Sequence, residues 1–258
     1  MNKVANFFLA ALLAMGASYP ARLWADWSWT EQLTTLVTVD GQPTFQSAVH
    51  ARVALKGDIA KIEDRDQAGV RYYNFANNNV VFLSLKTKTF MTVPFRGLLE
   101  QARAEKAGVR NSLDTAEAAA DRNLNLASGR ISKAQVQGQR RRFALEGPPF
   151  RLEATRETMT RLSHPCRKYR GYAGSDNYLE VWVAEDLKPD PAFRQYAESL
   201  VELDPLGSQH LLAAPGFPLQ AAFHFGPVEV DWEVQSLSLA PLPVEEFLLP
   251  PGAQPALP

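Results

Sequence analysis

Apolar and polar residues alternate along the first half of the chain, in short segments that turn residues separate. In residues 45–55, apolar and small residues occupy every second position: Phe45, Ser47, Val49, Ala51, Val53 and Leu55. Successive side chains of a β-strand point to opposite faces of the sheet, so this period of two predicts a half-buried strand. Lys56-Gly57-Asp58 then predicts a turn into the next strand.

Residues 69–93 are apolar on both faces of the strands that they predict. Val80 and Phe82 lie on one face, and Val81 and Leu83 lie on the other. A strand with two apolar faces is covered on both sides. Asparagine tolerates positive φ, so the Asn-rich stretch 77–79 predicts a tight turn within a three-stranded meander.

Helical periodicity occurs in two places. Residues 96–126 are rich in Ala, Glu and Arg and carry one apolar stripe, which predicts a helical insertion that covers the meander. Gly108 and Asn111 are expected to divide it into two helices. A third helix is predicted after Asp190, a natural N-cap, with Pro191 at the first helical position.

The remaining segments predict further short strands, with a bulge near Gln235 where the apolar phase changes. Strands that follow one another through short turns pair in antiparallel fashion. We therefore expect an α+β fold, with a curved antiparallel sheet of about ten strands covered by about three helices. Residues 26–250 are expected to form one domain, and residues 251–258 a flexible tail.

The first 25 residues have the layout of a secretory signal peptide. Lys3 precedes the apolar run of residues 7–17, and Pro20 breaks the segment that follows, which ends in Ala25. The run is shorter than the roughly 20 residues that a membrane anchor needs. We expect cleavage after Ala25, with Gly16 or Ala17 as alternative sites, and no transmembrane segment in the mature chain. The predicted location is the periplasm.

The composition of the chain bears on which partners it binds and on which bonds stabilise it. The chain has 258 residues, a formal net charge of −1 and one cysteine, Cys166. A nearly neutral chain gives no sign of a nucleic-acid partner. A lone cysteine allows no intramolecular disulfide, so the core must provide the stability. We expect Cys166 to be a small buried apolar residue, with a reactive thiol as the alternative.

Several segments resemble an exported bacterial family of unknown function, whose architecture is similar to that of the lipoprotein carriers LolA and LolB. The resemblance rests on the order of weak motifs across residues 45–250: "KGDIAKIED", "GVRYYNFANNNVVFLSLKTKTFMTV", "PCRKYRGYAGSDNYLEVWVAEDL", "GFPLQAAF" and "PVEEFLLPPG". It implies a half-open β-barrel closed by helices, with an apolar concave surface that holds acyl chains. The chain departs from the family at Lys61, where arginine is common, and at His164-Pro165, where glycine is common.

Signatures of catalysis are absent from the sequence. It contains no GxSxG, HExxH, GxGxxG or P-loop motif. The histidines are far apart in sequence, although His50 and His224 lie in predicted strands and could meet. We therefore expect a non-enzymatic protein without a cofactor or a metal site.

Aromatic residues in predicted strands are the main candidates for a binding surface. If the sheet is curved, some of them line its hollow, although core packing is the simpler explanation. These candidates are Tyr72, Phe82, Phe90, Trp182, Phe223, Phe225 and Trp232. A second candidate is an anion patch formed by Arg140, Arg141 and Arg142.

The leading hypothesis is a carrier that holds a lipid, an acylated protein or another apolar ligand in the concave face of the half barrel. The alternative is an envelope protein–protein interaction module without a small-molecule ligand, in which a sheet edge or the arginine patch binds the partner. The sequence does not indicate an oligomeric state.

Overall fold

The computed structural model describes residues 26–39, 42–122, 136, 150–173, 176–203, 212–225 and 228–256. The first part contains β1 (Trp27–Val39), β2 (Gln42–Lys56), β3 (Ile59–Asp64), β4 (Gly69–Asn74), β5 (Asn79–Ser84), β6 (Thr89–Pro94) and α2 (Phe95–Asp121). The second part contains β7 (Phe150–Arg161), β8 (His164–Ala173), β9 (Asp176–Ala184), α4 (Pro191–Leu203), β10 (Phe217–Phe225), β11 (Val228–Ser238), the 3-10 helix η2 (Val244–Phe247) and β12 (Gln254–Pro255).

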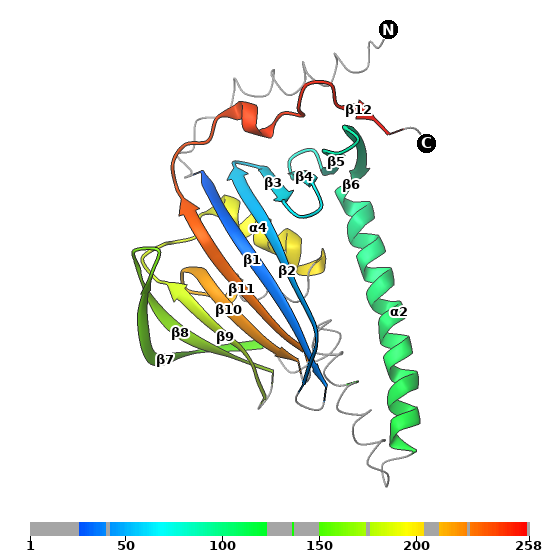
Figure 1. Cartoon of the computed structure of the whole chain (residues 1–258), viewed down its shortest axis with the longest axis vertical. Helices are drawn as coiled ribbons and strands as arrows, with labels where there is room; N and C mark the ends of the chain where they lie inside the picture. Colours follow the sequence, from blue (N-terminus) through cyan, green and yellow to red (C-terminus); the bar gives the residue numbers. More distant parts are fainter. Residues whose placement is uncertain are drawn as a thin grey trace.

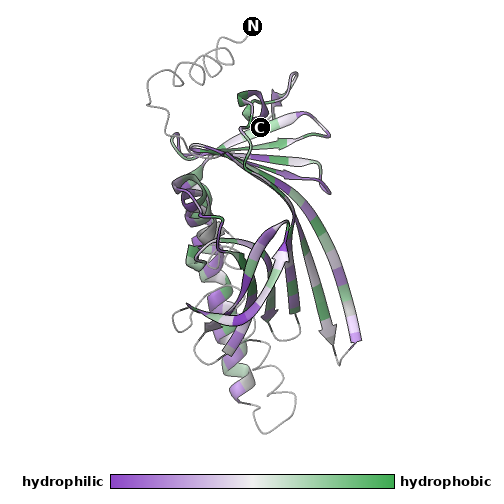
Figure 2. Cartoon of the chain, turned by 90° about the vertical axis from the view of Figure 1, so that its left-hand side faces the viewer, coloured by the Kyte–Doolittle hydropathy of each residue, from purple (hydrophilic) through white to green (hydrophobic). Residues whose placement is uncertain are grey.

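The strands form one sheet in the order β12-β6-β5-β4-β3-β2-β1-β11-β10-β9-β8-β7. Every neighbouring pair is antiparallel, as expected, except the parallel pair β12–β6. The edge strands β12 and β7 lie at opposite ends of this order, so the sheet is open. Figures 1 and 2 show a strongly twisted sheet whose two edges stay apart.

The expected α+β half-open barrel of the LolA/LolB type, with about ten strands under about three helices, was therefore wrong. The described residues form a twelve-stranded open sheet and only two α-helices. The reason lies in the long central strands β1 and β2, which have 13 and 15 residues. They join two groups of shorter strands edge to edge, so that no pairing remains to close a barrel.

Three successive turns of the β3–β6 meander repeat the same local chemistry. A side-chain oxygen accepts a hydrogen bond from the backbone N–H three residues later in each turn: Asp64 from Gln67, Asn74 from Asn77 and Ser84 from Thr87, at 2.8, 2.9 and 3.3 Å. The next residue has positive φ in each turn: Ala68, Asn78 and Lys88, at 54°, 51° and 55°. These turns fix the registers of the meander, as the Asn-rich stretch predicted.

The face of the sheet that packs against α4 and the start of α2 is called the inner face here, and the opposite face is the outer face. Trp27 and Trp29 of β1 lie on the inner face and contact Phe193 of α4 and Phe217 of β10, with ring centroids 5.1–6.1 Å apart. Asp190 caps α4 as predicted, because its Oδ1 accepts the backbone N–H of Phe193 at 2.9 Å. Burial of these rings makes this the main core of the molecule.

The helical insertion is one helix rather than two. α2 runs without interruption through Gly108 and Asn111, and the Ser112 hydroxyl donates a hydrogen bond to the Gly108 carbonyl at 3.1 Å. A glycine inside a helix costs only about 1 kcal/mol relative to alanine, which does not end a helix that has good formers on both sides. Asp114 and Glu117 also lie inside α2.

The end of the chain also differs from the expected flexible tail. After β11, residues 239–256 cross the outer face of the sheet, and β12 pairs with the edge strand β6 (Figure 1). The bulge expected near Gln235 is confirmed, since the β1–β11 register passes from Glu31–Val234 to Thr30–Ser236. In the part of the chain that the structure describes, neither α-helix is apolar over a length that could cross a bilayer.

Candidate functional site

An apolar patch remains exposed on the inner face of the β1–β2 hairpin. It consists of Leu33, Val37, Phe45, Val49 and Trp232, and we call it the hairpin patch. The side chains of Leu33 and Phe45 are 37% and 55% exposed, and the other three are half-buried. Leu33 lies opposite both Val49 on β2 and Trp232 on β11, and Phe45 lies opposite Val37. The patch therefore spans three neighbouring strands, and the polar pair Thr35–Ser47 lies between its Leu33–Val49 end and its Val37–Phe45 end.

The exposure of this patch changes abruptly along a row of paired residues. Beyond Trp232, the row continues through Ala221 on β10 to Val181 on β9, and both of these side chains are fully buried. The same apolar face is thus covered over β9 and β10 and exposed over the hairpin. Val37 and Trp232 belong to both regions, because they pack against the buried cluster around Phe223 and Val230. The hairpin patch is therefore the exposed edge of a buried apolar cluster.

A carboxylate lies at the upper end of the hairpin patch. Oε2 of Glu31, two residues from Leu33 on the inner face of β1, accepts hydrogen bonds from the indole Nε1 of Trp29 at 2.6 Å and of Trp232 at 3.1 Å. Hydrogen bonds to an ionised acceptor are shorter and stronger than neutral ones. Glu31 therefore fixes the orientation of the Trp232 ring at the border between the patch and the main core.

The structure divides the aromatic candidates between the two faces, so they do not line a single surface. Phe223 and Phe225 lie in the buried inner-face cluster, Phe82 packs against the main core, and Trp232 belongs to the hairpin patch. Tyr72 and Phe90 lie on the outer face beneath Ala253. Burial raises the pKa of Tyr72 to about 12.

Trp182 is half-buried and, like Phe82, packs against the main core. It lies on the outer face of β9, where the Lys168 ammonium is 5.8 Å from the centroid of its ring. The candidate anion patch of Arg140, Arg141 and Arg142 lies outside the described residues, as does the predicted signal peptide of residues 1–25.

Leu33, Phe45 and Val49 were not candidates from the sequence. The alternation of Phe45 and Val49 with polar residues predicted a half-buried strand, and in most strands of this kind the apolar side is covered. The sequence signal was therefore present but pointed to a core. Only the arrangement of the covering elements shows which part of the apolar face remains exposed.

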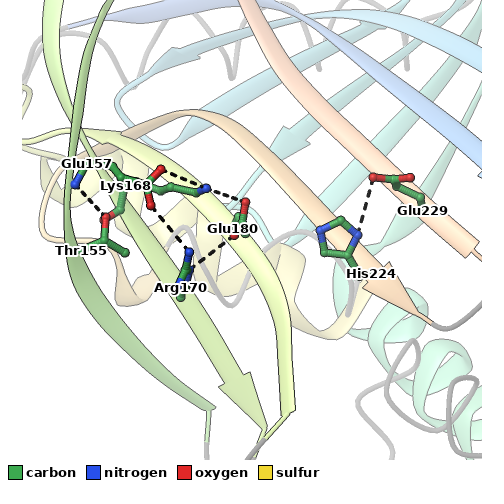
Figure 3. A network of polar contacts seen from close by, with 7 residues as sticks. All are labelled: Thr155, Glu157, Lys168, Arg170, Glu180, His224 and Glu229. Atoms are coloured by element: carbon green, nitrogen blue, oxygen red, sulfur yellow. Dashed lines mark hydrogen bonds and ion pairs between the residues drawn. The ribbon is translucent and has the colours of Figure 1, made fainter.

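The outer face of β7–β10 carries a network of charged residues (Figure 3). Lys168 forms ion pairs with Glu180 at 2.7 Å and with Glu157 at 3.4 Å, and Arg170 pairs with the same two carboxylates at 3.4 and 3.6 Å. The hydrogen bond between Lys168 and Glu180 is the main cause that raises the pKa of the lysine and lowers that of the glutamate. Thr155 accepts the backbone N–H of Glu157 at 3.1 Å. Side chains of opposite charge therefore alternate over this part of the outer face.

Each histidine in the described residues has its own carboxylate partner. His50 lies 3.4 Å from Asp66, His164 lies 2.8 Å from Asp186, and His224 lies 3.6 Å from Glu229 (Figure 3). Although His50 and His224 share the outer face, they belong to separate pairs. His210 is outside the described residues. Within the described ranges, no group of three or more His, Cys, Asp or Glu side chains could hold a metal ion.

Cys166 is buried, as expected, with 3% of its surface exposed. Its Sγ donates to the His164 carbonyl at 3.5 Å, and burial is the main cause that raises the pKa of its thiol. A buried thiol with a raised pKa is a poor nucleophile. Cys166 therefore serves packing.

No protein-family model and no curated protein matches the sequence. Among solved structures, an uncharacterized conserved protein from Thermus thermophilus aligns with 11% identity and a TM-score of 0.42 over 91% of each chain. PNGF-II aligns with 12% identity and a TM-score of 0.31 over 88% of this chain and 31% of its own. Both scores are below 0.5, so neither likeness supports a conclusion about fold or function.

Proposed function

We propose that this protein is a non-enzymatic binding protein that holds an apolar ligand against the hairpin patch. The observation that carries the proposal is the exposure of Leu33 and Phe45 on a face whose continuation, at Ala221 and Val181, is fully buried. A cluster of exposed apolar residues next to a core is typical of ligand or partner sites, whereas single exposed apolar residues are common on any protein. The proposal includes the periplasmic location that the sequence predicts.

The chemistry of the patch fits an aliphatic chain, such as the acyl chain of a lipid or an acylated protein. The ligand surface consists of two aliphatic residues on β1, Val49 and Phe45 on β2, and the Trp232 ring. Each methylene buried against it contributes about 0.8 kcal/mol. Such binding needs no reacting group, in line with the expectation that the protein is not an enzyme.

A fluorescence titration with the apolar dye N-phenyl-1-naphthylamine, followed by displacement with palmitate, tests the proposal. Phe45→Asp places a charge in the hairpin patch and should weaken dye binding by at least about tenfold, which corresponds to about 1.4 kcal/mol. Because Phe45 is 55% exposed, the substitution should leave the fold intact. The matched control is Leu85→Asp, at an apolar residue that is 45% exposed in the turn between β5 and β6. Equal dye binding by the two variants, or no displacement by palmitate, contradicts the proposal.

A second candidate function, a protein–protein interaction module, is favoured by the edge strand β7. This strand is 12 residues long and lies at the end of the sheet, where a further strand could add to its edge. Its exposed charged side chains and the register shift between Ala154 and Thr158 are features by which proteins protect edges from pairing. For this reason the hairpin patch is the stronger candidate.

A further inference from the structure

The C-terminal segment of the chain lies on the outer face as a proline-containing peptide, which is extended on either side of the 3-10 helix η2. We call residues 239–256 the strap. It leaves the end of β11, crosses the outer face of β2–β5 and ends beside the edge of β6 (Figure 1). It contains Pro241, Pro243, Pro250, Pro251 and Pro255, which favour an extended backbone. The strap is thus a peptide bound to a folded surface, joined to that surface through β11.

Charged residues of the sheet hold the first half of the strap. Asp26 Oδ2 accepts the Lys56 ammonium at 2.7 Å and the backbone N–H of Leu242 at 2.7 Å, while Lys56 also donates to the Leu242 carbonyl at 2.8 Å. Further along, the Arg52 guanidinium forms an ion pair and hydrogen bond with Glu246. The sheet thus recognises one carboxylate of the strap, that of Glu246, and one backbone position, that of Leu242.

Apolar and backbone contacts hold the second half. Phe247 is 8% exposed, and the Tyr72 hydroxyl donates to the Leu248 carbonyl at 3.4 Å. Ala253 covers an apolar cluster that includes Tyr72. The N–H of Gln254 donates to a carbonyl of the turn before β6 at 2.9 Å, and the N–H of Ala256 donates to a carbonyl of β6 at 2.7 Å. Backbone pairing at a sheet edge combined with a side-chain pocket is how proteins recognise extended peptides.

The strap is attached more weakly than the sheet beneath it. Within residues 239–256, Phe247 is the only buried side chain, and Leu239, Val244 and Leu249 are 37–57% exposed. Its strand β12 pairs through two residues, whereas β1 and β2 pair along almost their full lengths. Segments with few buried apolar contacts open at a lower free energy than the whole molecule unfolds. The strap should therefore leave its site while the sheet stays folded.

We infer that the outer face of β2–β6 is a peptide-binding surface that the strap occupies in cis and that a proline-containing peptide with a Glu-Phe pair in a 3-10 turn can occupy in trans. The strap then acts as a tethered competitor, whose high effective concentration limits binding from outside. This surface lies on the opposite side of the sheet from the hairpin patch, so the inference does not depend on the proposed function.

Fluorescence anisotropy with a labelled peptide of residues 239–256 tests the inference on the full-length chain. Phe247→Ala in the protein weakens the tethered competitor and leaves the surface intact, so it should tighten peptide binding by at least about tenfold. In the labelled peptide, Glu246→Ala removes the partner of Arg52 while the strap of the protein keeps its own contacts, so this change should reverse most of the gain. Glu245→Ala in the peptide, at the neighbouring exposed carboxylate, should not. Failure of the Phe247→Ala variant to bind the peptide, or equal binding of the Glu246→Ala and Glu245→Ala peptides, overturns the inference.

Hydrogen exchange on the unaltered protein provides a second measurement that does not depend on how the variants fold. The amides of Gln254 and Ala256 should exchange by local opening, at least about tenfold faster than the amides that join β1 and β2. Exchange of both sets at the same rate would mean that the strap opens only when the molecule unfolds, and the inference would be wrong.

Discussion

Arg161 at the end of the edge strand β7 forms an ion pair with Glu233 on β11, although three strands lie between them. Neighbouring strands are about 4.8 Å apart, so in a flat sheet the two strands would be separated by about 19 Å. The guanidinium also donates to Gln220 of β10 at 3.0 Å. The sheet is therefore strongly curled toward its outer face at this end, and Arg161 links the edge hairpin to the middle of the sheet.

Arg161→Met should destabilise the protein by about 1 kcal/mol, because it removes this link while retaining an apolar side chain of similar length. Urea unfolding followed by circular dichroism measures the change. Arg151→Met is the matched control: its ion pair with Glu153 joins two side chains that are more than half exposed, so the change should stay within about 0.5 kcal/mol. Equal effects of the two substitutions would show that the Arg161 contacts contribute no more than a surface pair.

Glu31→Leu should destabilise the protein by about 2 kcal/mol, because it removes the acceptor that Trp29 and Trp232 share. Glu31→Gln keeps one carbonyl acceptor and should cost less. Urea unfolding monitored by tryptophan fluorescence measures both effects, and the fluorescence of the folded state reports the environment of the rings. A larger cost for glutamine than for leucine would contradict the proposed role of this side chain as an acceptor.

Lys88→Gly should stabilise the protein by about 0.5–1 kcal/mol. Lys88 has a φ of 55°, which glycine adopts without the strain that a side chain causes there. Lys86→Gly in the same turn is the control, since it should destabilise by increasing the entropy of the unfolded chain alone. Thermal unfolding of the two variants gives the comparison, and a lower melting temperature for Lys88→Gly would disprove the argument from strain.

The acid limb of the stability curve should depend on Glu180. The hydrogen bond from Lys168 holds its folded-state pKa below the ordinary value of 4.5, which the unfolded chain retains. The corresponding stabilisation is complete above pH 4.5 and is lost as the pH falls through the lower, folded-state pKa. Glu180→Gln should therefore lower stability at pH 7 and lose less of it on acidification. Urea titrations from pH 7 to about pH 3 test this.

Asp231 should change stability with pH in the opposite direction to Glu180, and the same urea titrations measure it. Burial, followed by the charge of Glu229, raises the pKa of its carboxyl above the ordinary value of 3.8. The folded state then binds the proton more tightly than the unfolded chain, so stability falls as the pH rises from about 3.8 through the folded-state pKa. Asp231→Asn should consequently raise stability at pH 7, whereas Glu180→Gln lowers it. A change of the same sign in both variants would refute the assignment.

Local features of the fold could be predicted from the sequence because neighbouring residues cause them. The Asn-rich turn of the meander, the cap at Asp190 and the bulge at Gln235 depend on residues within a few positions of each other. The prediction that Gly108 divides the segment into two helices was wrong. A glycine inside a helix costs less free energy than ending a helix where the neighbouring residues all favour helix formation.

The candidate site could not be predicted in the same way. Leu33 and Trp232 are 199 positions apart in sequence and lie opposite each other only because β1 pairs with β11. The aromatic candidates were chosen by residue type, and the two faces of the sheet then separated Tyr72 and Phe90 from Phe223 and Phe225. Residue type predicts burial, but the pairing of distant strands decides which buried residues are neighbours.

The sequence by itself determined that this protein is built from antiparallel hairpins, because alternation and turn chemistry act over a few residues. Tertiary structure alone decided that the sheet stays open, that its inner face is covered at β9 and β10 but exposed at Leu33 and Phe45, and that the strap covers the outer face. Coverage depends on where helices and distant segments come to rest on the sheet. An apolar residue has the same tendency to be buried wherever it lies in the chain. The sequence around it therefore does not show whether another element covers it in the folded protein.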